Sequence, residues 1–264
     1  MVQRFATSQM SILRSAVLVV CFSLFVAAAA VAQPLRVAAA SDLQAALPGI
    51  AARFEQATGK HVALTFGSSG NFFTQLQNGA PFDVFLSADI DYPRQLERDG
   101  QAEKGSLSRY ATGRIVLWIR NESTIDLKRG LAALADPGVR RVAIANPDHA
   151  PYGRAAVAAL QHARVYDRVQ PKLVRGENMS QAAQFVQSGN ADAGVVALSL
   201  ALAPALKTSG RYVEIPTAFY PPIEQAAAVV AASKQKAIAR QFVAFLKQPE
   251  SARRLTAFGF VVAD

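Results

Sequence analysis

Hydroxyl groups and backbone N–H groups gather at four places where a strand-like apolar run leads into a helical pattern. The runs are LRVAAA, HVALTF, RVAIA and LVR, and they lead into Ser41, Ser68-Ser69-Gly70, Pro151-Tyr152-Gly153 and Asn178-Met179-Ser180. The first turn of a helix leaves backbone N–H groups without partners, and such groups bind anions together with the helix dipole. These junctions therefore predict hydrogen bonding to a small anion, with no covalent step.

The charges at the junctions indicate the kind of anion. Each helix start carries about half a positive charge, so four of them would supply about +2, which suits a dianion. No junction has Lys or Arg at its centre, and the nearest basic residues are Arg154 and Arg175. Glycines flank the serine pair in Gly67–Gly70 and would let a ligand approach the backbone closely. For any single junction the alternative is structural, because serine at a helix start is most often an N-cap.

Enzyme motifs are absent from the sequence. There is no G-x-S-x-G, Walker A, G-x-G-x-x-G or H-E-x-x-H pattern. Three histidines and one cysteine leave little room for a histidine metal site and none for a Cys-rich zinc site, so no cofactor is expected. A nucleophilic Ser41 or Ser69 with His149 as its base stays open as an alternative.

The composition is typical of a globular protein. Of 264 residues, 51% are hydrophobic and 18% charged, which excludes a disordered tail, a collagen and a coiled coil. The formal net charge of +9 is scattered along the chain, without the aromatic and basic stripe of single-strand binders. We therefore expect no nucleic-acid partner, and a mild positive field would attract a small anion.

The first 32 residues are predicted to be a secretory signal peptide. An apolar run at 16–31 follows a basic start, and Ala30-Val31-Ala32 fits a cleavage site. The alternative is a membrane anchor, but the run is short for a span of about 20 residues. Cys21 lies inside the run rather than at its end, which argues against lipidation. The expected mature chain, Gln33–Asp264, is exported and not embedded in a membrane.

Strand and helix patterns alternate through the rest of the chain, which predicts an α/β fold. The expected strands are Leu35–Ala40, His61–Phe66, Phe82–Ser87, Arg114–Arg120, Arg141–Ala145, Leu173–Arg175, Ala193–Ala197 and Gln225–Ala231. The first expected helix has an apolar face of Leu43, Leu47, Ile50 and Phe54, restarts at Pro48 and ends at Gly59. Further helices are expected over Phe72–Asn78, Tyr92–Asp99, Leu127–Ala135, Gly153–Ala163, Asn178–Ser188, Lys236–Lys247 and Ala252–Phe258.

This alternation predicts two lobes, each an open and mostly parallel sheet flanked by helices. The first is expected from 33–112 plus 224–264, and the second is an insertion at 113–223. Ligands of open α/β sheets lie outside the carboxyl ends of strands, so a cleft between the lobes could gather all four junctions. Thr112–Gly113 and Pro216–Pro222 are the candidate hinges.

Four stretches of the chain resemble the periplasmic molybdate-binding proteins of ABC importers. They are VAAASDL at 37–43, FGSSGNFFTQLQNGAPFDVFLSAD at 66–89, ANPDHAPYGRAA at 145–156 and GENMSQAAQFVQSGNADAGVVALS at 176–199. The resemblance covers essentially all of the expected mature chain. It implies a two-lobed type II binding protein that is not an enzyme. Such a protein closes on molybdate, and also on tungstate, in the periplasm and delivers it to a membrane permease, and we expect it to be a monomer.

The resemblance also implies which residues hold the oxyanion. They are the hydroxyls of Ser41 and Ser69 and the N–H groups of Tyr152 and Met179, with the metal present as molybdate and not as a bare ion. Some family members carry a Tyr where this chain has Ala197, and some carry a hydroxyl where it has Ala40. The number of hydroxyl ligands therefore stays open, and with it the selectivity. The alternatives are sulfate or another oxyanion, an organic anion, or an exported serine hydrolase.

Overall fold

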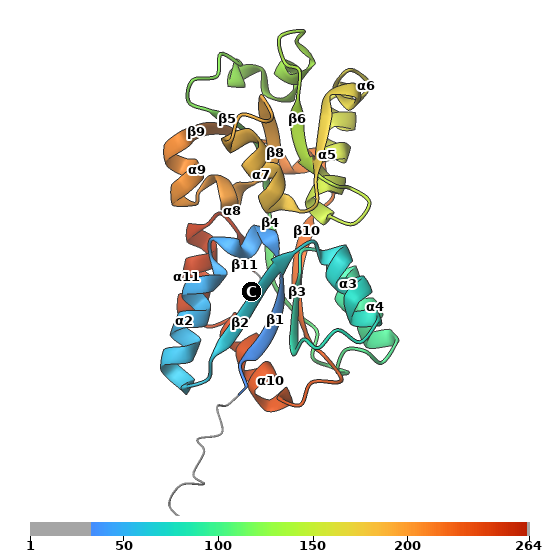
Figure 1. Ribbon diagram of the computed structural model, residues 1–264, viewed down its shortest axis with the longest axis vertical. Helices are drawn as coiled ribbons and strands as arrows, with labels where there is room; N and C mark the ends of the chain where they lie inside the picture. The colour runs from blue at the N-terminus through green and yellow to red at the C-terminus, as the bar shows by residue number, and fades with distance from the viewer. Residues whose placement is uncertain (1–32, 263–264) are drawn as a thin grey trace, which may run out of the picture. The chain divides into compact units, whose positions relative to one another are not determined.

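The computed structural model describes residues 33–262, and the chain forms one compact unit from Pro34 onward. The expected signal peptide at 1–32 lies outside the described residues. Two separate sheets, each with its own helices, make up the described part (Figure 1). We name the six-stranded sheet with its helices the first lobe and the five-stranded sheet with its helices the second lobe.

The first lobe combines the beginning and the end of the described chain. Its strands in spatial order are β11 (Val261–Val262), β4 (Ser108–Gly113), β10 (Ile223–Val229), β3 (Val84–Ser87), β1 (Leu35–Ala40) and β2 (Val62–Gly67). Its helices are η1 (Ser41–Gln44), α2 (Leu47–Thr58), α3 (Ser69–Gln77), α4 (Asp91–Arg98), α10 (Lys236–Phe245) and α11 (Pro249–Ala257). Strand β1 is parallel to β2 and β3, whereas β10 is antiparallel to β3 and β4.

Helix α2 forms where the sequence predicts an amphipathic helix. All four residues of the predicted apolar face are buried, with Leu43 in the preceding turn η1 and Leu47, Ile50 and Phe54 in α2. Pro48 lies in the first turn, where its missing N–H costs no helical hydrogen bond. Gly59 ends the helix in the left-handed conformation, with φ +67°. In Figure 1, α2 and α11 lie to one side of the first-lobe sheet, and α3 and α4 lie to the other.

The second lobe is built from the middle of the chain around one apolar cluster. Its strands in spatial order are β7 (Leu173–Gly176), β6 (Val142–Ala145), β8 (Ala193–Ala197), β5 (Ile115–Arg120) and β9 (Gly210–Glu214). Its helices are η2 (Leu127–Ala135), α5 (Pro151–His162), α6 (Tyr166–Val169), η3 (Gln170–Lys172), α7 (Met179–Gln187), α8 (Leu198–Ala201) and α9 (Pro204–Ser209). Strand β6 is parallel to β7 and β8, whereas β5 is antiparallel to β8 and β9.

The chain passes between the lobes at two points. One is the short link between β4 and β5 at Arg114, and the other is the segment between β9 and β10, which contains η4 (Thr217–Phe219). The candidate hinges Thr112–Gly113 and Pro216–Pro222 lie at these two crossings. Motion about them, and the lobe boundaries at 112 and 224, stay predictions.

The sheets are mixed rather than mostly parallel. Over residues 33–262 four strand pairings are parallel and five are antiparallel. The antiparallel pairings belong to β4, β5, β9, β10 and β11, the strands next to the crossings and at the end of the chain. Strands β4, β9 and β11 were not predicted, because SRYATG and GRYVE are largely polar and VV is too short to show a pattern. No helix in the described part of the chain is long and apolar enough to cross a membrane.

Candidate functional site

All four predicted junctions meet in one small hollow between the lobes. It is lined by Ala40, Ser41, Asp42, Gly67, Ser68, Ser69, Ala88, Ala150, Pro151, Tyr152 and Met179. The structure thus brings together the four residues singled out from the sequence, Ser41, Ser69, Tyr152 and Met179, and each of them is 1–3% exposed. We name this site the junction hollow.

The two serines are not N-caps. Ser41 Oγ accepts hydrogen bonds from the N–H groups of Met179 at 3.0 Å and Ser180 at 3.4 Å, which belong to the other lobe. Ser69 Oγ accepts from the N–H of Ala88 at 2.9 Å. The starts of η1 and α3 have no side-chain capping bond, so neither serine caps the helix that it begins, although Ser41 Oγ accepts from the first two N–H groups of α7. A hydroxyl whose oxygen accepts an N–H still has its own proton to donate, and both serines can therefore donate to an anion.

Three of the junctions are starts of true α-helices. Ser69 and Met179 are the first residues of α3 and α7, and Tyr152 is the second residue of α5. Pro151 has no N–H, so the N–H of Tyr152 is the first that α5 offers. The fourth junction, η1, is a single 3-10 turn of four residues. The predicted charge of about +2 is therefore too high, and three helix starts supply about +1.5.

Contacts between the lobes surround the junction hollow. The carbonyl oxygen of His149 accepts from the Ser68 hydroxyl at 2.6 Å and from the N–H of Gly70 at 2.9 Å. A Cβ on residue 70 would lie 2.5 Å from that same oxygen, so only glycine allows this approach. On the other side, the Ser199 hydroxyl donates to the carbonyl oxygen of Asp42 at 2.7 Å. These contacts hold the donors of the two lobes around one point.

Asp42 is the one ionisable carboxyl in the lining of the junction hollow. Its Oδ2 accepts from Gln225 Nε2 at 2.6 Å and from the Tyr152 hydroxyl at 2.9 Å. Its Oδ1 is buried without a hydrogen-bond partner among the described residues. Burial raises the pKa of Asp42 to about 6, although both hydrogen bonds oppose the rise. Burial and the Asp42 charge hold the pKa of Tyr152 well above its ordinary value, so its phenol is a proton donor.

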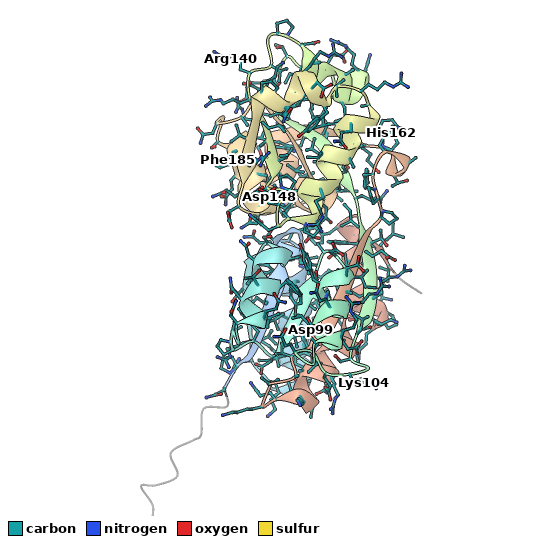
Figure 2. All side chains as sticks on the ribbon, turned by 90° about the vertical axis from the view of Figure 1, so that its right-hand side faces the viewer. Asp99, Lys104, Arg140, Asp148, His162 and Phe185 are labelled. Carbon is teal, nitrogen blue, oxygen red and sulfur yellow. The ribbon has the colours of Figure 1, made fainter. Side chains whose placement is uncertain are left out.

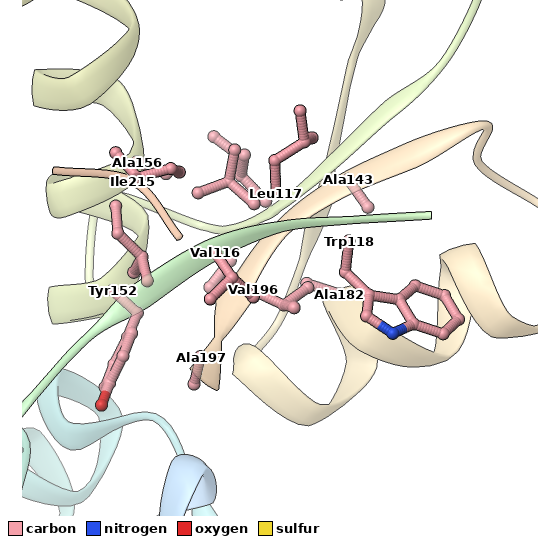
Figure 3. Packing of buried hydrophobic residues seen from close by; sticks show 14 of the residues in the cluster. Val116, Leu117, Trp118, Ala143, Tyr152, Ala156, Ala182, Val196, Ala197 and Ile215 are labelled. Atoms are coloured by element: carbon pink, nitrogen blue, oxygen red, sulfur yellow. The ribbon is translucent and has the colours of Figure 1, made fainter. Parts of the chain in front are cut away.

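Tyr152 extends from one lobe to the other. In Figure 3 its ring leaves the apolar cluster of the second lobe and its hydroxyl points toward the first-lobe ribbon. Ala197, at the end of β8, is fully buried and its N–H lies 3.2 Å from the Met179 sulfur. Neither Ala40 nor Ala197 brings a hydroxyl to the site. The Tyr152 hydroxyl donates to Asp42 and the Ser68 hydroxyl donates to the His149 carbonyl, so the side-chain hydroxyls available to an anion are those of Ser41 and Ser69.

Sequence reasoning missed two residues of this region, Gln225 and Tyr110. The Tyr110 hydroxyl donates to Gln225 Oε1 at 2.9 Å, and both side chains are buried. One polar residue in the apolar run QAAAVVA is a signal that could have indicated Gln225, because buried polar groups need partners. Tyr110 gave no such signal, since its strand β4 was not predicted.

The structure does not place His149 as the base of a catalytic serine. Its Nδ1 lies 2.9 Å from Ser68 Oγ, whereas Ser41 Oγ and Ser69 Oγ meet backbone N–H groups. Over residues 33–262 no three His, Cys, Asp or Glu side chains are grouped so that they could hold a metal ion.

A second and larger hollow adjoins the first. It is lined by Ala88, Asp89, Ile90, Asp91, Arg94, Pro151, Arg154, Ala155, Pro221, Pro222, Ile223 and Glu224, and we name it the charged groove. Arg154 of the second lobe forms an ion pair with Asp89 of the first at 2.5 Å and donates to the Tyr92 hydroxyl at 3.2 Å.

Uncharged donors from two α/β lobes, brought together in one small hollow, define a two-lobed solute-binding protein with its ligand site between the lobes. The chain belongs to the family of bacterial extracellular solute-binding proteins, whose family model matches residues 35–261. This membership confirms the resemblance seen in the four stretches of sequence.

Individual relatives are similar over most of the chain. Molybdate-binding protein ModA of Azotobacter vinelandii is 39% identical over 234 residues, 89% of this chain and 92% of the relative. ModA of Rhodobacter capsulatus is 40% identical over 212 residues, 80% and 82% of the two chains. The solved structure of the A. vinelandii periplasmic molybdate-binding protein superposes with a TM-score of 0.82 at 36% identity, covering 87% of this chain and 100% of that one.

These relatives confirm the two-lobed fold class. They are molybdate-binding proteins and not enzymes. The chain is accordingly not an enzyme, and the serine hydrolase alternative is wrong.

Proposed function

We propose that this chain is the solute-binding component of an ABC importer and that it binds molybdate in the junction hollow. The observation that carries the proposal is the meeting of hydroxyl and N–H donors from both lobes with no Lys or Arg in the lining. The similarity to ModA proteins, at 39–40% identity over most of the chain, supports molybdate as the anion.

The anion is held by directed hydrogen bonds. The hydroxyls of Ser41 and Ser69 and the N–H groups of Tyr152 and Met179 act as donors, and bonds to a charged acceptor are the strong kind. The Met179 N–H donates to Ser41 Oγ at 3.0 Å in the structure, so it must exchange this acceptor for the anion. Burial strengthens them further, because water does not compete. Tungstate is also a tetrahedral dianion and uses the same donors. Sulfate is the alternative ligand, distinguished only by how well its size matches the distances between donors.

Binding is coupled to closure of the two lobes about the crossings at Thr112–Gly113 and Pro216–Pro222. Ligand shifts an open–closed equilibrium only as far as it binds the closed form better. Donors that come from both lobes support this coupling, because Ser41 Oγ of the first lobe lies 3.0 Å from the Met179 N–H of the second. The lobe bounds proposed from the sequence are 33–112 plus 224–264 for the first lobe and 113–223 for the second, although Gly113 and Ile223 pair with each other in the first-lobe sheet.

The chain acts in the periplasm as a monomer. Export through the signal peptide at 1–32 and delivery of the anion to a membrane permease complete the proposal. The periplasmic relatives and the extracellular family support this location.

Calorimetric titration of the mature chain, Gln33–Asp264, tests the proposal. Molybdate and tungstate should bind 1:1 with micromolar or tighter affinity, about −8 kcal/mol or below. Sulfate and phosphate are titrated alongside. Tight sulfate binding without molybdate binding, or no oxyanion binding, would overturn the assignment.

A further inference from the structure

Three buried polar side chains of the first lobe form a chain of hydrogen bonds below the junction hollow. The Tyr110 hydroxyl, from β4, donates to Gln225 Oε1, from β10, at 2.9 Å, and Gln225 Nε2 donates to Asp42 Oδ2 at 2.6 Å. Each side chain is at most 1% exposed. Because Tyr110 supplies a proton to the amide oxygen, the amide nitrogen must face Asp42. The first lobe therefore holds Asp42 Oδ2 in a fixed place by its own contacts, and we name these three residues the Asp42 socket.

Tyr152 of the second lobe completes the Asp42 socket. Its hydroxyl donates to Asp42 Oδ2 at 2.9 Å and lies 3.2 Å from Gln225 Nε2. Its backbone N–H, at the start of α5, belongs to the lining of the junction hollow. One residue thus carries a donor for the anion and a second donor for the opposite lobe.

Gly113, at the crossing between the lobes, makes room for this contact. A Cβ at position 113 would overlap the Tyr152 hydroxyl. The backbone of Gly113 does not have a positive φ, so glycine is needed here for space and not for conformation. The absence of a side chain at position 113 therefore leaves the space that the Tyr152 phenol occupies at the crossing.

We infer that the Tyr152 phenol is a positioning group that ties lobe closure to anion binding, with the Asp42 socket as its receptor. The inference rests on the proposed function. The phenol leaves the socket when the lobes part, so its hydrogen bond stabilises only the closed form and shifts the equilibrium toward it. Without the phenol, closure buries the carboxylate with one donor fewer, which is costly for a charged group. The raised pKa of Tyr152 keeps the phenol protonated and able to donate.

Tyr152→Phe is the first test, because it removes the hydroxyl and keeps the N–H that faces the anion. Molybdate should dissociate about tenfold faster, with an association rate within about twofold of wild type, since contacts made after encounter act on dissociation. Tyr212→Phe removes an exposed hydroxyl from the same lobe and is the matched control. An unchanged dissociation rate in Tyr152→Phe would overturn the inference.

Distances between labels on the two lobes give a second measurement. They should change only if the phenol affects lobe closure, and not if its role is merely structural. The only cysteine of the sequence is Cys21, so the mature chain accepts spin labels at Asp99→Cys and Arg140→Cys without competition. Both positions are exposed, and Figure 2 shows Asp99 on the lower lobe and Arg140 on the upper. With saturating molybdate, Tyr152→Phe should show a larger population at the longer, open distance than wild type. Identical distance distributions would count against the phenol as a closure contact.

Gly113→Ala gives an independent approach to the same contact. Its methyl group should displace the phenol and speed dissociation as Tyr152→Phe does. In the double variant the second change should add little, because residues that act through one contact are not additive. Additive losses would overturn the inference. A wild-type chain that binds no oxyanion would instead overturn the proposed function, and the label distances without anion would still decide whether the phenol holds the lobes.

Discussion

The junction hollow and the charged groove lie side by side between the same two lobes, yet their chemistry is opposite. They share Ala88 and Pro151 in their linings. The junction hollow presents serine hydroxyls and helix N–H groups on buried residues. The charged groove presents long ionisable side chains, and Arg154 and Asp89, which pair across it, are 40% and 25% exposed.

This difference shows how a protein can hold a dianion without a formal positive charge. N–H groups at helix starts are held in place by the fold, so they need no reorganisation when an anion arrives. An arginine in the charged groove already has an acid partner and is screened by water, so it contributes little free energy to the binding of an anion. The buried hollow has no Lys or Arg in its lining, and its one carboxyl, Asp42, accepts from Gln225 and Tyr152. Its oriented donors make it the better anion site, and the groove next to it serves as an internal control.

The largest effect is expected for Ser69→Asp. A carboxylate at the start of α3 would lie next to the bound dianion, and two like charges about 4 Å apart repel by about 4 kcal/mol in a partly buried setting. Molybdate binding should be lost to calorimetry. Arg154→Gln changes the net charge by the same amount in the charged groove and should keep binding, while thermal unfolding checks that both variants fold. Equal losses of molybdate affinity in the two variants would show that the two hollows do not differ as anion sites.

Asp42 should produce a pH dependence of stability of up to about 3 kcal/mol. Its pKa is about 6 in the folded protein against an ordinary 3.8, so the folded state binds more protons between these values. The free energy of unfolding should therefore fall as pH rises from about 4 to about 6, and the full penalty applies above that range.

Urea unfolding of wild type and Asp42→Asn at intervals from pH 4 to pH 7 measures this effect. The variant lacks the titrating group, so its stability relative to wild type should increase with pH over the same window. Parallel curves for the two proteins would show that this carboxyl titrates normally.

Removing single hydroxyls should have a smaller effect on affinity. Ser41→Ala and Ser69→Ala should each weaken molybdate binding by about 1–3 kcal/mol, the range for a hydrogen bond to a charged group. Ser188→Ala, an exposed serine of the second lobe, is the control. If neither substitution lowers the affinity by calorimetry, the site assignment is wrong.

The smallest effect is expected in the charged groove. Arg154→Gln should change the affinity for molybdate by less than about 1 kcal/mol, as for other partly exposed ion pairs. The change should shrink further as salt is added, because screening is strong at these exposures. A loss equal to that of Ser69→Ala would mean that the groove is part of the anion site.

Much of the fold was readable from local sequence. The apolar face from Leu43 to Phe54, the proline in the first turn of α2 and the left-handed Gly59 were predicted and are confirmed. Strands β4 and β9 were missed because they are largely polar and take their stability from partners far away in the chain. The mixed strand directions were missed for a similar reason. The direction of a strand next to a crossing depends on the path that the chain takes through the other lobe, and local sequence does not show this path.

The sequence by itself determined the four junctions, because a strand end, a serine or glycine and a helix start are encoded within a few neighbouring residues. Only the tertiary structure decided what their side chains do. Ser41 meets Met179 across 138 positions, and Asp42 meets Gln225 across 183. Such partners follow from burial: a buried polar group must find a donor or acceptor, and folding alone determines which one lies within reach.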